Sequence, residues 1–146
     1  MPPLIPEEDY NQCNFRKTDT PRGPPGPLEC EKHMCILQKN NLTRSNGKID
    51  PVSSNDFFEK WATSTTDPAS FKEAINIAKD RCSSEAQGPN PSPCPAARFL
   101  MCSSSVIFMV SFMETKCPKS AWSTSYSCKE LRDFFDQCSD VLIKYF

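Results

Sequence analysis

The 146-residue chain lacks most of what catalysis and nucleic-acid binding require. His33 is its one histidine, so a Ser-His-Asp or Cys-His arrangement has no choice of base. Seventeen basic and eighteen acidic residues are mixed along the chain, which leaves a formal net charge of -1 and no basic stripe for a phosphate backbone. We therefore expect neither an enzyme nor a nucleic-acid-binding protein.

Strand patterns and long apolar runs are also scarce. Only four glycines are present, and no window alternates apolar and polar residues as a strand does. The best apolar run, Val106 to Met113, is interrupted by Ser111, so we expect no segment long enough to span a membrane and no membrane insertion. The first eight residues resemble no signal peptide, and we interpret the sequence as a mature chain. These absences predict a soluble, all-α protein.

Cysteine is abundant, with nine residues in the chain. Zinc sites favour close CxxC pairs, which do not occur here, and the stretch Cys30-Glu31-Lys32-His33-Met34-Cys35 fits no common zinc spacing, so we expect no metal. Spread cysteines in a chain of this size are typical of secreted, disulfide-bonded proteins, although nine free thiols in a cytosolic protein are the alternative. The cysteines are Cys13, Cys30, Cys35, Cys82, Cys94, Cys102, Cys117, Cys128 and Cys138.

Composition also predicts the domain organisation. Residues 1–27 hold seven of the fourteen prolines, which predicts an extended N-terminal arm that Cys13 ties to the body. Residues 28–138 then form one helical domain, and residues 139–146 form a C-terminal tail. Hydrophobic residues make up only 38% of the chain, so disulfides worth roughly 2–4 kcal/mol each would offset a thin core.

Apolar periodicity predicts six to seven short helices. Leu28 to Gln38 shows helical spacing, Ser54-Asn55-Asp56 could cap a second helix, and Asp67-Pro68 is a strong start signal for a third. Residues 96–116 are apolar almost all round, which predicts a central helix that Pro118 ends. Ser123, Thr124 or Ser125 caps a last long helix.

Three cysteine-centred features carry a family resemblance. The stretch from Cys35 to Leu42 is followed by Gly47-Lys48-Ile49-Asp50, a long interval separates Cys35 from Cys82, and Cys117-Pro118 is followed by two further cysteines. In these features the chain resembles the insect odorant-binding proteins, and within them the cysteine-rich Plus-C group. It departs from the family because Cys30 and Cys35 lie five positions apart rather than four, and because Phe108 stands where the fifth core cysteine belongs.

The resemblance also implies a disulfide pairing. It pairs Cys13 with Cys35 and Cys82 with Cys117, and then Cys30 with Cys102. Because of the departures, Cys102 could pair with Cys30 from a shifted position, or that bridge is absent. Cys94, Cys128 and Cys138 are left unassigned, and one of the nine must be unpaired or intermolecular.

The resemblance implies a helical bundle around a hydrophobic cavity, in a secreted carrier of odorants or pheromone-like volatiles that works without a cofactor. Such a carrier would act in sensillum lymph or another body fluid, with an olfactory receptor or a second copy of the chain as further partners. Tyr126, Tyr145 or Ser111 could supply one orienting hydrogen bond to the ligand. The residues expected to line the cavity are Phe57, Phe58, Trp61, Phe71, Ile75, Phe99, Ile107, Phe108, Met109, Phe112, Met113, Trp122, Phe134, Phe135, Tyr145 and Phe146.

Other interpretations of the same residues stay open. Aromatic side chains at helical spacing are also what an ordinary filled core shows. In the tail, Leu142, Tyr145 and Phe146 could plug the cavity or form an ordinary amphipathic end. The alternative function is a secreted interaction protein or inhibitor of the salivary or venom type, with the arm from Pro2 to Pro27 as its recognition element. Asn41-Leu42-Thr43 is a sequon for N-glycosylation.

Overall fold

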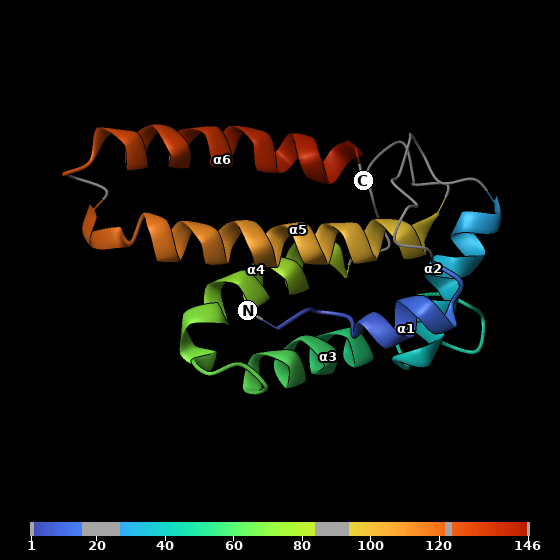
Figure 1. The fold of residues 1–146 in the computed structure, drawn as a ribbon. Helices are drawn as coiled ribbons and strands as arrows, with labels where there is room; N and C mark the ends of the chain where they lie inside the picture. The colour runs from blue at the N-terminus through green and yellow to red at the C-terminus, as the bar shows by residue number, and fades with distance from the viewer. Residues whose placement is uncertain (1, 16–26, 84–93, 122–123, 146) are drawn as a thin grey trace.

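The computed structural model describes residues 2–15, 27–83, 94–121 and 124–145, and for residues 27–28, 114–116, 119, 135–136 and 138–145 it describes the backbone alone (Figure 1). Within these ranges the chain forms six α-helices, two short 3-10 turns and no strand, which confirms the all-α prediction. The helices are α1 (Glu7–Gln12), α2 (Pro27–Lys39), α3 (Pro51–Thr63), α4 (Lys72–Cys82), α5 (Pro95–Lys116) and α6 (Tyr126–Tyr145), and the 3-10 turns are η1 (Pro68–Phe71) and η2 (Lys119–Ala121).

Helix α5, 22 residues long, is the central element. Figure 1 shows α6 running antiparallel along one side of α5, with α3 and α4 on the opposite side and α1 and α2 gathered near the N-terminal end of α5. The predicted range 96–116 matches α5 within one residue, and the helix ends before Pro118 as expected. Because α5 contacts α2, α4, η1 and α6, most of the other elements are positioned relative to it.

One expectation about α5 was wrong. Over Pro95–Met113 the helix is long and apolar enough to span a membrane by length and composition alone, because Ser103 to Ser105 lower its hydropathy too little to interrupt the run. More than half of that stretch is buried within the protein. Such burial is typical of the core helix of a soluble protein, and it fits the place of α5 between α6 on one side and α4 and α3 on the other (Figure 1).

The N-terminal arm is not extended throughout, contrary to the prediction. Glu7 to Gln12 form α1, which starts after Pro6 and carries three acidic residues in its first turn, where the helix dipole favours negative charge. Cys13 follows directly and is bonded to Cys35 in α2. The arm is therefore a helix fastened to another helix in the part that the structure describes, and residues 16–26 lie outside that part.

Two helix starts differ from the sequence prediction. Helix α3 begins at Pro51, three residues before the predicted cap, because the Asp50 side chain accepts a hydrogen bond from the Val52 backbone N–H at 3.0 Å. Asp67-Pro68 was predicted to start an α-helix, but the chain forms η1 there, the Asp67 side chain makes no cap, and α4 begins only at Lys72. Ser125 caps α6 as one of the three predicted residues, since its hydroxyl accepts from the Cys128 N–H at 3.4 Å.

The end of α2 explains the turn that follows it. Asn41 has a φ of 55°, and the Leu42 N–H bonds to the carbonyl of Leu37 at 2.9 Å while the Asn41 N–H bonds to that of Gln38 at 3.1 Å. This is a Schellman ending, and Leu37 and Leu42 supply its buried apolar contact. Gly47, with a φ of 78°, then turns the chain so that Thr43 and Ile49 form an isolated bridge.

Candidate functional site

Four disulfides staple the helices, and they correct two of the three implied pairs. Cys13–Cys35 is confirmed. Cys82 is bonded to Cys102 rather than Cys117, and Cys30 to Cys94 rather than Cys102. Cys102 lies in α5 and Cys117 directly follows that helix, fifteen positions later and roughly 22 Å further along the axis. The end of α4 that bonds to Cys102 therefore cannot also lie beside Cys117.

The remaining pair closes the α5–α6 connection. Cys117, just after α5, is bonded to Cys128 in the first turns of α6, with 5.3 Å between their Cα atoms. Eight of the nine cysteines are thereby used, and the side chain of Cys138 lies outside the described part. Cys94 also caps α5, since its sulfur accepts from the Ala97 N–H at 3.4 Å. Each helix from α2 onward except α3 thus carries at least one disulfide at or near an end.

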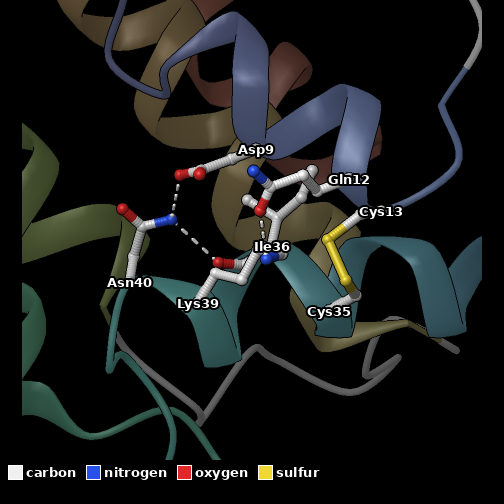
Figure 2. The surroundings of a disulfide bond; sticks show 7 residues. All are labelled: Asp9, Gln12, Cys13, Cys35, Ile36, Lys39 and Asn40. Atoms are coloured by element: carbon white, nitrogen blue, oxygen red, sulfur yellow. Dashed lines mark hydrogen bonds between the residues drawn. A yellow bond between two sulfur atoms is a disulfide. The ribbon is translucent and has the colours of Figure 1, made fainter.

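The first disulfide lies in a polar contact between α1 and α2 (Figure 2). The Asn40 amide nitrogen donates to Asp9 Oδ2 at 3.0 Å and to the Ile36 carbonyl at 2.9 Å. Lys39 donates to the side chain of Gln12 beside them. Together with Cys13–Cys35 these bonds fix α1 on the last turns of α2 and hold the N-terminal segment against the body.

Seven of the predicted lining residues come together in the main core. Phe58 and Phe99 are fully buried, and their ring centroids lie 5.7 Å apart across α3 and α5. Trp61 packs edge-on against Phe71 of η1, with 5.0 Å between the ring centroids. The aromatic members come from α3, η1 and α5, and the seven residues are Phe57, Phe58, Trp61, Phe71, Ile75, Phe99 and Ile107.

Three other predicted lining residues are exposed. Phe108 is 59% exposed and Phe112 is 43% exposed, and their rings stack one turn apart on α5 with centroids 6.4 Å apart. Phe134 of α6 is 62% exposed. The buried side chains of this part of α5, such as Ile107 and Val110, belong to the main core, so the two phenylalanines point away from it.

Of the remaining predicted lining residues, two methionines are described by the structure and four aromatic residues have undescribed side chains. Met113 is buried in a small cluster with Cys117 and Cys128, against which Leu131 packs, and Met109 is half-buried. The side chains of Phe135 and Tyr145, and the whole of Trp122 and Phe146, lie outside the described part. This small cluster beside the Cys117–Cys128 bond joins the end of α5 to the start of α6.

The residues expected to orient a ligand by a hydrogen bond lie in different environments. Ser111 donates to the Ile107 carbonyl at 2.5 Å, Tyr126 is 75% exposed, and the Tyr145 side chain is outside the description. In the described part, Trp61 Nε1 and Asn55 Oδ1, both on α3, are the buried side-chain atoms without a hydrogen-bond partner. Sequence reasoning placed Trp61 on an apolar face and overlooked its N–H, although an indole in an apolar stripe is itself the signal.

Electrostatics add little to the site. Burial raises the pKa of Tyr10 in α1 and lowers the pKa of Arg98 in α5. His33 donates from Nδ1 to the Glu29 carbonyl at 2.6 Å and packs edge-on against Phe15. No group of three or more histidine, cysteine or acidic side chains that could hold a metal ion occurs in the described ranges.

Comparison with known proteins finds a distant relative of this chain. The chain is 23% identical to general odorant-binding protein 68 of Anopheles gambiae over 161 aligned positions, which cover 97% of this chain and 68% of that protein. No family model matches the sequence, and no solved structure matches it. The similarity extends over nearly the whole disulfide-stapled helical chain, and we conclude that the protein is a distant homologue of an insect general odorant-binding protein.

Proposed function

We propose that this protein is a carrier that binds small hydrophobic molecules, such as odorants or pheromone-like volatiles. The observation that carries the proposal is a relationship to an odorant-binding protein that spans 97% of the chain. The structure supports it with an aromatic cluster at the meeting of α3, η1 and α5, centred on Phe58, Phe99 and Trp61. The relative is a binding protein by name, which supports a role without catalysis.

The physical basis is burial of apolar ligand surface. Transfer of apolar surface from water contributes about 25 cal/mol per Å2, which for a small volatile supports affinity on the order of micromolar after the entropy of binding is subtracted. Phe57 and Met109 are half-buried and lie on the two helices that flank the cluster, so side-chain movement there would admit a ligand. The disulfides would hold the helices in place during that movement.

The proposal extends to where the protein acts, to its subgroup and to its domain organisation. Four disulfides fit a protein that works outside the cell, and we propose secretion and Plus-C membership on that basis. We also propose that residues 28–138 are the binding domain, residues 1–27 its arm and residues 139–146 its tail. The backbone of residues 139–145 continues α6, so the tail would act as the last turns of a helix.

Fluorescence titration tests the carrier. Oxidised, monodisperse protein is titrated with an environment-sensitive apolar fluorophore, and the probe is then competed with volatile alcohols, esters, aldehydes and aromatics. Saturation at about one probe per chain with displacement near micromolar volatile is expected. Absence of uptake by a folded, helical sample would contradict the proposal. In the same assay, deletion of residues 141–146 weakens binding if the tail covers the site, and unchanged affinity would remove that role.

A second candidate function is suggested by the exposed aromatic residues. Phe108 and Phe112 form an exposed stacked pair on α5, and single exposed aromatics are common but a stacked pair is typical of an interaction surface. A surface-acting interaction protein, or an assembly with a receptor or a second copy, would use such a patch. The double substitution Phe108→Ser/Phe112→Ser distinguishes the two functions: a carrier keeps its affinity for the fluorophore, whereas a surface-acting protein loses self-association measured by sedimentation or partner binding.

A further inference from the structure

The indole of Trp61 is a buried donor without an acceptor. The side chain is only 6% exposed, and among the described residues no oxygen or nitrogen accepts from Nε1. The hydroxyls of Ser64 and Thr65, just after α3, donate to the Trp61 and Ala62 carbonyls at 2.6 Å each, and neither hydroxyl accepts from Nε1. Indole N–H is a donor only, so an acceptor has to come from elsewhere.

Leaving such a group unpaired is costly, and native proteins rarely do it. Buried side-chain donors are nearly always bonded to protein, to ordered water or to a ligand. A buried water needs two to four polar partners. Trp61 belongs to the main hydrophobic core, and Phe71 packs edge-on against its indole ring. The other unpaired atom, Asn55 Oδ1, is an acceptor, but it belongs to a residue six positions earlier on α3, roughly 9 Å away along the helix axis and about 120° around it.

We propose that Trp61 Nε1 donates a hydrogen bond to an acceptor oxygen of the bound ligand, and that the protein selects apolar molecules carrying a ketone, aldehyde, ester or ether oxygen. This inference rests on the proposed carrier function. The indole contributes its ring to the apolar wall and its N–H to orientation of the ligand, so Trp61 is a specificity-determining residue. A hydrocarbon of the same shape gains the burial but leaves the N–H unpaired.

Pairs of ligands that match in shape but differ in the acceptor oxygen test the proposal. Acetophenone and isopropenylbenzene share one shape and differ in a carbonyl oxygen against a methylidene carbon, as do longer methyl ketones and their methylidene analogues. Trp61→Phe retains an aromatic ring and removes the donor, so it should weaken ketone binding about three- to tenfold and leave hydrocarbon binding unchanged. Equal effects on both members of every pair would overturn the proposal.

Nuclear magnetic resonance of the wild-type protein provides a readout that does not depend on a variant's folding. With 15N-labelled tryptophan, the Trp61 indole proton should move downfield on addition of the ketone and much less with its hydrocarbon partner, while the indole of Trp122 serves as the internal reference. If the fluorophore binds at one site but no ketone shifts the Trp61 indole proton, the proposed hydrogen bond is refuted and the proposed carrier function is retained. If the fluorophore itself is not bound, the carrier function fails first.

Discussion

Cys30 in α2 is bonded to Cys94, 64 positions later in the sequence, with their Cα atoms 5.6 Å apart. Cys94 stands at the start of α5, where its sulfur also accepts from the Ala97 N–H. This single residue therefore fastens the central helix to α2 and caps its first turn. The longest closed loop of the four disulfides is the one that positions the central helix.

Removal of this bridge should cost more stability than removal of the shortest one. In the chain-entropy account, opening the Cys30–Cys94 loop with a separation of 64 costs about 4 kcal/mol, and opening Cys117–Cys128 with a separation of 11 costs about 3 kcal/mol. Cys30→Ala with Cys94→Ser keeps an oxygen as cap acceptor, and Cys117→Ala with Cys128→Ala is the comparison. Urea denaturation measures both, and a larger loss for the short loop would contradict the account.

The two environments of phenylalanine predict opposite outcomes for one substitution. Phe58 is fully buried against Phe99, so Phe58→Ala should cost about 3–5 kcal/mol of unfolding free energy. Phe108 is 59% exposed on α5, and Phe108→Ala should change stability by no more than about 0.5 kcal/mol. Denaturant unfolding of both variants is the measurement. Similar losses at the two positions would mean that Phe108 is covered in solution.

The cap at the start of α3 predicts that two substitutions of Asp50 will differ in their effect on stability. Its carboxylate accepts from the Val52 N–H at 3.0 Å and from the Ser53 hydroxyl at 3.3 Å. Asp50→Ala should therefore cost about 1 kcal/mol, whereas Asp50→Asn, which supplies an equivalent cap acceptor, should cost much less. Thermal unfolding compares the two variants. Equal losses would show that the cap contributes nothing and that Pro51 alone sets the helix start.

Burial of Tyr10 predicts a loss of stability at alkaline pH. Because the pKa of its phenol is raised in the folded protein, folding favours the protonated form. That contribution is fully present below the unfolded pKa of about 10 and is lost as the pH rises through the folded value. Between about pH 9 and about pH 11 the wild type should lose more unfolding free energy than Tyr10→Phe. The sample is thiol-blocked to prevent disulfide exchange, and parallel curves would refute the prediction.

Local signals in the sequence predicted the bounds of α5 and the start of α6, and contacts between distant segments were harder to predict. Pro118 and Ser125 mark the end of α5 and the start of α6 because caps and prolines act within one turn. The Asp50-Pro51 start signal was present but overlooked in favour of Ser54. Cys82 met Cys102 because α4 packs along the early part of α5, which no spacing rule reveals.

The sequence indicated which residue types the candidate site would contain, but it did not indicate which way their side chains point. Phe58, Phe99 and Trp61 were predicted to line a cavity, and the structure places them in the main hydrophobic core. Phe108 and Phe112 could not be separated from them, because α5 is apolar around most of its circumference and periodicity cannot assign its outward face. The unpaired N–H of Trp61 depends on what surrounds it in space, and only the packed structure reveals that.

Calorimetric titration of the oxidised protein tests the central claim, uptake of one small apolar molecule per chain, most directly. The titrant is the best competitor from the volatile panel, and the titration is repeated at two temperatures. The account predicts a single saturable site per chain and a negative heat-capacity change, since apolar surface leaves water on binding. Absence of saturation, or several weak sites with no heat-capacity change, would contradict it.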